Sequence, residues 1–299
     1  MADHLTDASA LARVRSSLLA WYAADHRDFP WRRTTDPYAV LVSEVMLQQT
    51  QASRIAVRFP TFMRGFPTAA ALAATTEAEV LAAWSGLGYN RRALALRRAA
   101  AEVAAHGWPR EVEALEALPG IGPYTARAVA SLAFGQPVGV VDTNVRRWLV
   151  RRFGLRADGP RSELQTLANA LAATGSLTDA AAWTHATMEF GAAVCTPRNP
   201  RCDRCPIARG CPSRGRAAPV AVPRQAAFAG SDRALRGTVL RALAGAKAHA
   251  VTLRSARALL PADARERVMA GLERDGLVHL SGRRLVLGGP PEPAATIGP

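Results

Sequence analysis

Apolar residues recur at helical spacing over most of the chain, from Leu11 to about Gly191. These Ala- and Leu-rich runs follow a period near 3.6 residues, and clusters of proline and glycine separate them. The alternation of apolar and polar residues that is typical of strands is scarce in this region. The pattern therefore predicts a mainly α-helical fold, built from successive helices joined by short turns.

A different pattern begins near Ser231, after a stretch at 216–230 whose Pro, Ala and Arg content is typical of a linker. Beyond it we expect helices and short strands, the last two strands forming a hairpin across Ser281 and Gly282. The helices are expected at 232–244 and 262–275, and the strands at 251–253, 277–280 and 283–287. This order predicts a small α+β, winged-helix-like unit over 231–289, followed by a disordered tail at 290–299.

Length and composition are those of a globular protein with more than one core, since the 299 residues are 49% hydrophobic. No apolar run approaches the length of a membrane span, and the N-terminus lacks the features of a secretory signal, so we expect a cytoplasmic protein. The net charge of +14 favours a polyanionic partner such as nucleic acid. A compositional bias toward arginine is the alternative explanation of that charge.

All four cysteines fall at 195–211, in a C-x6-C-x2-C-x5-C array made of Cys195, Cys202, Cys205 and Cys211. Clustered thiols in a reduced compartment usually hold a metal or an iron–sulfur cluster. A structural zinc site usually has two C-x2-C pairs, and only one is present, so a 4Fe–4S cluster is favoured over zinc. The loop between the first two cysteines carries Arg198, which we expect to contact a phosphate backbone.

Gly120 and Gly122 lie in the string LPGIGPYTA, between one helix that ends near Leu118 and another that runs to about Phe134. Two glycines at the start of a helix let backbone N–H groups approach an anion closely. An ordinary tight turn would explain a lone G-x-G equally well. The whole string favours a helix–hairpin–helix at 114–134 that binds a DNA phosphate.

Two carboxylates stand out as candidate chemistry. Asp36 and Pro37 predict a helix start, and within that helix Glu44 shares an apolar stripe with Val40 and Leu47. Burial raises a carboxyl pKa, which suits a general acid, although a carboxylate at the edge of the core is the simpler interpretation. Asp142 follows an extended apolar run and precedes a helical one, which predicts a helix N-cap.

Taken together in this order, PWR, SEVMLQQTQ, GLGYNRRA, LPGIGPYTARAVASLAFG, VVDTNVRR and the cysteine array resemble the helix–hairpin–helix DNA glycosylases, and SEVMLQQTQ resembles their MutY branch. The resemblance covers about residues 10–215. It implies an enzyme that flips adenine out of duplex DNA, at A·G or A·8-oxoguanine mispairs, and hydrolyses its glycosidic bond. It also implies a six-helix barrel module at 29–136 and an iron–sulfur module at 137–215, with the helix at 1–28 packed on the latter.

The resemblance assigns roles to individual residues. Glu44 matches the acid that protonates adenine, and Asp142 matches the carboxylate that stabilises the sugar cation, with Tyr124 and Asn144 assisting. Gln49 and Tyr89 match side chains inserted into the base stack, and Trp31, Arg32 and Leu47 match the adenine pocket. The remaining positions expected to contact substrate or DNA are Gln48, Thr50, Leu87, Gly120, Gly122, His185 and Arg198.

The sequence departs from the family pattern at three places. His185 stands where Gln or Glu usually reads the base edge, Asn90 replaces a second tyrosine after Tyr89, and a short C-terminal unit replaces a MutT-like domain. Tyr124 stands where the related endonuclease III enzymes carry a Schiff-base lysine, so a monofunctional enzyme is expected. An endonuclease III-like lyase and a non-catalytic iron–sulfur DNA-binding protein are the two alternatives.

Overall fold

The computed structural model describes residues 7–174, 179–216 and 228–290. It divides into two compact units: unit 1 comprises Met1–Pro60 and Trp108–Pro223, and unit 2 comprises Thr61–Gly107 and Arg224–Pro299. Most of the predicted linker at 216–230 and nearly all of the predicted tail at 290–299 lie outside the described residues. The predicted module boundaries follow a different division and stay predictions.

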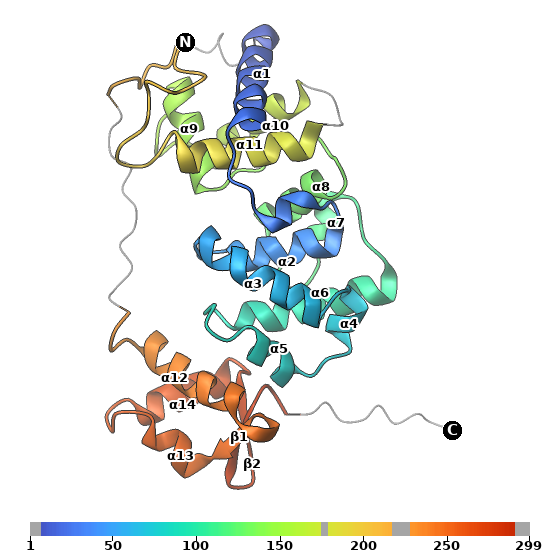
Figure 1. Cartoon of the computed structure of the whole chain (residues 1–299), viewed down its shortest axis with the longest axis vertical. Helices are drawn as coiled ribbons and strands as arrows, with labels where there is room; N and C mark the ends of the chain where they lie inside the picture. The colour runs from blue at the N-terminus through green and yellow to red at the C-terminus, as the bar shows by residue number, and fades with distance from the viewer. Residues whose placement is uncertain (1–6, 175–178, 217–227, 291–299) are drawn as a thin grey trace. The chain divides into compact units, whose positions relative to one another are not determined.

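Unit 1 is entirely helical in its described part, as the apolar spacing predicts (Figure 1). Its helices are α1 (Ala8–Ala24), η2 (Pro30–Arg33), α2 (Pro37–Leu47), α7 (Val112–Glu116), α8 (Pro123–Leu132), α9 (Thr143–Phe153), α10 (Arg161–Ala173) and α11 (Ala180–Ala193). Helix α3 (Ala52–Gly65) begins in this unit. Leu18, Trp148 and Phe190 are fully buried in a core that joins α1, α9, α10 and α11. Helix α2 packs on α8, which in turn packs on α11.

The helix starts of unit 1 follow local sequence signals. The Asp36 side chain accepts hydrogen bonds from the N–H groups of Tyr38 and Ala39, with Pro37 at the first helical position, as predicted. Helix α2 is apolar on all sides, and every residue from Tyr38 to Met46 is buried. A helix of that kind belongs in a protein interior, so Glu44 is carried into the core with it.

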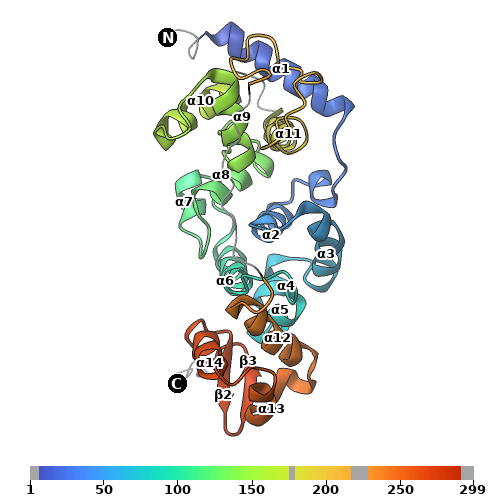
Figure 2. The same cartoon turned by 90° about the vertical axis from the view of Figure 1, so that its left-hand side faces the viewer.

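Unit 2 combines helices with a small sheet (Figure 2). Its elements are α4 (Ala69–Ala73), α5 (Glu77–Ala83), α6 (Arg91–His106), α12 (Asp232–Gly245), η4 (Lys247–His249), β1 (Ala250–Thr252), α13 (Leu253–Ala258), α14 (Arg265–Arg274), β2 (Val278–Ser281) and β3 (Arg284–Leu287). The sheet is antiparallel in the order β1-β3-β2. The predicted hairpin is present, but Ser281 ends β2 and pairs with Arg284, so the turn lies at Gly282 and Arg283, one residue later than expected.

Two expectations for this region were wrong in detail. Leu253 begins helix α13 and is not the end of a strand, because the Thr252 side chain accepts the N–H of Ser255 and caps a helix there. Helix α14 begins at Arg265 and not at Ala262.

Residues 61–107 and the C-terminal elements pack together in unit 2. Helix α12 packs on α5, and the Glu77 carboxylate accepts the N–H of Gly289 at 2.8 Å. Gly288 has φ +88°, and a Cβ atom there would lie 3.0 Å from the Cβ of Glu77, so this approach requires glycine. The C-terminal elements are therefore seated on α5 by backbone contact. None of the helices in the described ranges has the length and apolar character needed to cross a bilayer.

Candidate active site

Glu44 is a buried acid, with 4% of its surface exposed. Burial raises its pKa to about 7, while a hydrogen bond from the Tyr124 hydroxyl lowers it and the charge of Asp142 raises it. Desolvation outweighs the hydrogen bond because the charged carboxylate loses its water shell inside the core. A pKa near neutrality lets Glu44 hold a proton and give it up in this pH range, as a general acid needs.

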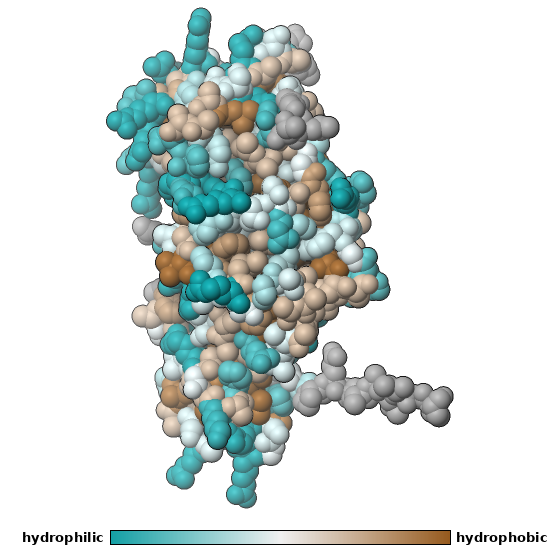
Figure 3. All heavy atoms as spheres, turned by 45° about the vertical axis from the view of Figure 1, so that its right-hand side comes forward, coloured by the Kyte–Doolittle hydropathy of each residue, from teal (hydrophilic) through white to brown (hydrophobic). Residues whose placement is uncertain are grey.

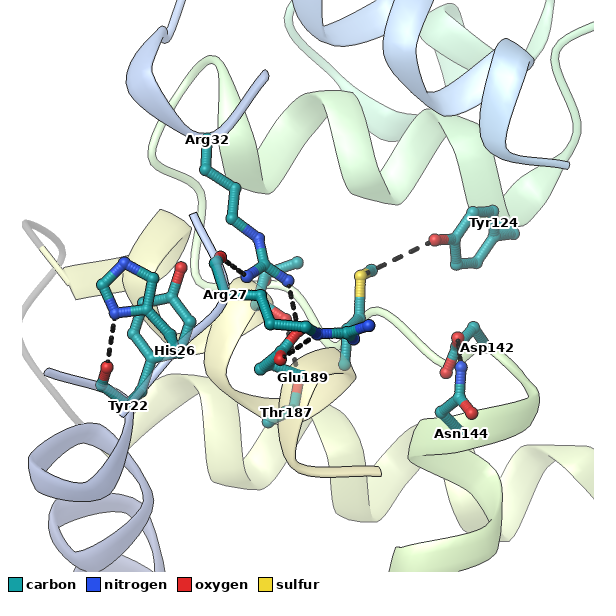
Figure 4. A network of polar contacts seen from close by, with 11 residues as sticks. Tyr22, His26, Arg27, Arg32, Tyr124, Asp142, Asn144, Thr187 and Glu189 are labelled. Carbon is teal, nitrogen blue, oxygen red and sulfur yellow. Dashed lines mark hydrogen bonds and ion pairs between the residues drawn. The ribbon is translucent and has the colours of Figure 1, made fainter. Parts of the chain in front are cut away.

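Tyr124, the second residue of α8, connects this acid to the rest of the cluster. Its hydroxyl lies 3.8 Å from the sulfur of Met188 on α11 (Figure 4). Burial, and then the charges of Glu44 and Asp142, raise the pKa of Tyr124 well above its ordinary value. The phenol therefore stays protonated and can donate a hydrogen bond to an anionic neighbour.

Asp142 is the N-cap of α9, which confirms the structural half of its prediction. Its carboxylate accepts the Val145 N–H at 2.6 Å and the Asn144 side-chain amide at 2.7 Å. Burial raises the pKa of Asp142 from its ordinary value, and those hydrogen bonds together with the charge of Arg147 oppose the rise. A carboxylate held by several donors keeps a fixed position, and its charge can face a cationic group.

Arg147 joins this cluster to the first cysteine, and sequence reasoning missed it. Its guanidinium donates to the Asn144 side-chain carbonyl at 3.0 Å, to the Cys195 backbone carbonyl at 2.7 Å, and to the Gly191 carbonyl. Gly191 permits this contact between α9 and α11, since a Cβ atom there would lie 2.6 Å from the Asn144 carbonyl oxygen. One buried side chain therefore spans from the partner of Asp142 to the cysteine segment.

Truncation of Arg147 should loosen both ends of this bridge. We expect Arg147→Ala to lower the free energy of unfolding by about 3 kcal/mol, because several buried carbonyl groups lose a charged donor. Thermal unfolding followed by circular dichroism and by visible absorbance measures the loss of helix and of the iron–sulfur chromophore. Arg161→Ala, at an exposed position, is the control. An unchanged melting temperature for Arg147→Ala would contradict the bridge.

Glu189 is a second buried acid in addition to Glu44, and the sequence analysis did not single it out. Its carboxylate pairs with Arg27 at 2.6 Å and with Arg32 at 2.8 Å, and its side chain is 2% exposed (Figure 4). The two guanidinium groups outweigh the opposing effect of burial and lower the pKa of Glu189 below its ordinary value. The signal was present in the sequence, because Glu189 interrupts an apolar helix in the same way as Glu44.

Three of the residues expected to form the adenine pocket, Trp31, Arg32 and His185, contact other side chains or are buried. Trp31 is buried and stacks on Phe29 with ring centroids 4.7 Å apart, and Arg32 lies 5.0 Å from the Phe29 ring centroid. His185 lies one helical turn before Glu189 on α11, and burial, with the charge of Arg32, lowers its pKa to about 3. The imidazole is therefore neutral at neutral pH.

The turn after α2 carries the next predicted residues. Leu47 ends the helix, the Gln48 side chain donates to the Thr125 hydroxyl at 3.3 Å, and the Thr50 hydroxyl donates to the Gln48 carbonyl at 3.2 Å. Between them, Gln49 is exposed and has φ +54°. A side-chain-bearing residue in the left-handed region stores strain of about 1–2 kcal/mol, which makes Gln49 a candidate functional position.

Unit 2 holds the other predicted inserting residue. Tyr89 is 42% exposed with φ +48°, and the Arg92 guanidinium lies 5.1 Å from the centroid of its ring. Leu87, two residues earlier, is buried. Tyr89 therefore shares with Gln49 an exposed side chain on a left-handed backbone.

The predicted helix–hairpin–helix is formed by α7 and α8. Gly120 has φ +74°, which favours glycine, and Gly122 is the N-cap of α8 with open space where a Cβ would lie. The free space at Gly122 leaves the positive end of α8 open to close approach by an anion. Helices α7 and α8 are shorter at their C-terminal ends than predicted, since they stop at Glu116 and Leu132.

The four cysteines line one cavity, whose apolar walls include Trp148, Phe190 and Ile207. In the described ranges no three His, Cys, Asp or Glu side chains converge closely enough to hold a single metal ion. Four cysteine thiols that line one cavity are a donor set that fits an iron–sulfur cluster, because such clusters are held by cysteine thiolates. Burial raises the pKa of the Cys205 thiol to about 11, so ligation by this residue releases a proton.

The loop between the first two cysteines is held from α9. The Arg151 guanidinium donates to the carbonyls of Thr196 and Pro197 at 2.6 and 2.9 Å. Arg198 follows directly and is exposed. The backbone on one side of Arg198 is therefore fixed, while its guanidinium is accessible to an anion.

Two family models match the chain: the HhH-GPD superfamily of base excision DNA repair proteins over 42–173, and the iron–sulfur binding domain of endonuclease III over 195–211. An adenine DNA glycosylase of Mycobacterium tuberculosis is 43% identical over 249 residues, covering 78% of this chain and 79% of that protein. The human adenine DNA glycosylase is 42% identical, covering 70% of this chain and 41% of that protein. Among solved structures, a thermostable thymine-DNA glycosylase matches with a TM-score of 0.63 and 30% identity, covering 70% and 99% of the two chains.

Proposed function

Because this chain belongs to the adenine DNA glycosylase family of helix–hairpin–helix base excision repair proteins, we propose that it hydrolyses the glycosidic bond of adenine mispaired with guanine or 8-oxoguanine, in the cytoplasm. The observation that carries this proposal is the buried Glu44, whose pKa of about 7 and position beside Tyr124 and Asp142 suit acid catalysis on a base. The family uses an iron–sulfur binding domain, and the four cysteines of this chain lie within it.

The two carboxyl groups have different roles in the proposed reaction. Glu44, in its protonated form, donates to a ring nitrogen of the flipped adenine, which turns the base into a neutral leaving group. Hydrogen bonds to Asp142 favour its ionised form against the effect of burial, and this carboxylate is proposed to stabilise the positive charge that develops on the sugar as the bond breaks. Water then adds to the sugar carbon and loses a proton, and uptake of a proton by the Glu44 carboxylate restores the acid. Tyr124 and Asn144 keep the two carboxyl groups in place.

A lyase step has no amine to support it in this site. Tyr124 lies where a lysine would form a Schiff base, and the chain's one lysine, Lys247, belongs to unit 2. Base release without strand cleavage is therefore the proposed outcome, which separates this proposal from an endonuclease III-like lyase.

The adenine pocket is proposed to form around Trp31, Arg32, Leu47 and His185. The ion pairs of Glu189 fix the Arg32 guanidinium, so one face of the pocket is preorganised. The neutral His185 ring can donate or accept one hydrogen bond at the base edge.

The bases around the mispair are proposed to be parted by Gln49 and Tyr89, next to Gln48, Thr50 and Leu87. Their left-handed backbones support this, because strain of that kind persists where a side chain must be presented. Phosphates are proposed to bind at Gly120, Gly122 and Arg198.

The strain at Gln49 yields a matched pair of variants. Gln49→Gly removes the left-handed penalty, whereas Gln49→Ala keeps it, so we expect the glycine variant to be about 1 kcal/mol more stable than the alanine variant. Both should excise adenine from a mispair more slowly than the wild type, since neither fills the base stack. Chemical denaturation and single-turnover excision measure the two effects. Equal stability, or full activity in either variant, would contradict this role.

The proposal is tested with duplexes that carry A opposite 8-oxoguanine, G or T, each resolved on a denaturing gel with and without alkali. We expect excision opposite 8-oxoguanine and G, none opposite T, and breaks only after alkali. Breaks without alkali would indicate a lyase. No excision by protein with a fully loaded cluster would leave only DNA binding.

A further inference from the structure

The C-terminal part of unit 2 gathers three arginines at one end of its sheet. Arg283 lies in the exposed β2–β3 turn, Arg284 is the first residue of β3, and Arg254 is the second residue of α13. The Leu253 N–H donates to the Arg283 carbonyl at 3.0 Å, and Thr252 is paired with Arg284 in the β1–β3 ladder. These backbone contacts hold the start of α13 against the hairpin. We call Arg254, Arg283 and Arg284 the hairpin edge.

The hairpin edge is exposed, and one of its three guanidinium groups is held by a hydrogen bond. All three arginines are exposed, and the Arg284 guanidinium donates to the Ala250 carbonyl at 2.9 Å, which holds it along β1. Hydrophilic side chains occupy the end of unit 2 where the hairpin turns, as seen in Figure 3. The exposed hydroxyls of Thr252 and Ser255 lie 2.7 Å apart beside the edge and add further donors.

Charge in this part of the chain is segregated. Residues 231–290 hold eleven Lys and Arg against five Asp and Glu, yet 246–262 and 276–290 contain no acidic residue. Three of the five acids pair with arginines other than those of the hairpin edge: Asp232 with Arg267 at 2.8 Å, Glu266 with Arg257 at 2.9 Å, and Asp275 with Arg236. No ion pair involves the hairpin edge within the part of the chain that the structure describes. Its positive charge is therefore left for an external anion.

We infer that the hairpin edge is a second DNA-binding surface, which contacts backbone phosphates of duplex DNA outside the lesion site. Exposed guanidinium groups bind phosphate through several N–H donors, and neutralising phosphates releases condensed counterions. A hairpin beside a helix presents such groups on a projecting and fixed frame. This surface binds without regard to base sequence, because phosphate contacts carry none. Its role is to hold the enzyme on the duplex while the base is excised.

A charge-matched comparison in the full-length protein tests this inference. The edge variant Arg254→Gln/Arg283→Gln removes two unpaired charges, and the control Arg257→Gln/Arg267→Gln removes two charges that are paired within the protein. Arg284 is left intact because its bond to Ala250 supports the sheet. Affinity for an undamaged, fully paired duplex is measured by fluorescence anisotropy over a range of KCl concentrations.

For the edge variant we expect about tenfold weaker binding at moderate salt, and a slope of log affinity against log salt that is smaller by about 2. The control lowers the net charge by the same amount. Its two arginines are paired with acids of the protein, so the slope should stay close to that of the wild type. Equal slopes for wild type and edge variant would overturn the inference, as would equal losses in edge variant and control. Single-turnover excision at saturating enzyme should be unchanged in the edge variant. If the wild type excised no adenine, the proposed function would be wrong. The binding comparison would still test the hairpin edge, because it measures affinity and not excision.

Discussion

Glu44→Gln is expected to lower the single-turnover rate of adenine excision by about a thousandfold, because glutamine keeps the shape of the side chain and cannot donate its proton. The wild-type rate should fall as pH rises through about 7, where Glu44 loses its proton. The residual rate of Glu44→Gln should not follow that profile. Rates measured between pH 5 and 9 with A opposite 8-oxoguanine test both statements.

The same variant separates chemistry from folding. The folded-state pKa of Glu44 is about 7 and its ordinary value is 4.5. Folding therefore favours the protonated form of Glu44. Its contribution to the free energy of unfolding is fully present below pH 4.5 and is lost as pH rises through 7. Glutamine has no charge to bury, so Glu44→Gln should be more stable than the wild type at pH 8, by about 3 kcal/mol. A variant that is destabilised, or that retains activity, would contradict the assignment of Glu44 as the buried acid.

Asp142→Asn is expected to slow excision by about 100- to 1000-fold while the helix remains capped. Asparagine caps helices about as well as aspartate, so α9 should keep its start and stability should stay within about 1 kcal/mol of the wild type. The negative charge that faces the sugar cation is lost, and that loss raises the barrier. Single-turnover excision and thermal melting measure the two properties.

Asp142→Ala is the companion variant, since it removes the cap together with the charge. It should be equally slow and also less stable by about 1–2 kcal/mol. If Asp142→Asn retained full activity and only Asp142→Ala lost it, Asp142 would be a structural cap alone.

Sequence reasoning succeeded where a local signal sufficed. Asp36 and Pro37 start α2, Asp142 starts α9, and β2 and β3 form the predicted hairpin around Gly282. The error at Leu253 has a local cause as well, because a three-residue strand runs directly into a helix with no proline or glycine between them.

The candidate site was predictable only in part. Glu44 could be found because helical spacing places it on an apolar stripe. The stripe alone predicts partial burial, and in the structure the residue is only 4% exposed. Glu189 shows the same signal, but its partners Arg27 and Arg32 are more than 150 residues away in the chain. The connection of Arg147 to Cys195 likewise depends on the packing of α9 against α11.

The sequence by itself determined the helices, their caps, the cysteine array and the identity of the two carboxylates, because spacing and capping act over a few residues. Only the tertiary structure decided that Glu44 has a pKa near 7, that Arg147 joins Asn144 to Cys195, and that residues 61–107 form one unit with the C-terminal elements. The physical reason is that desolvation and long-range hydrogen bonds depend on which surfaces meet in space, and no local pattern specifies that.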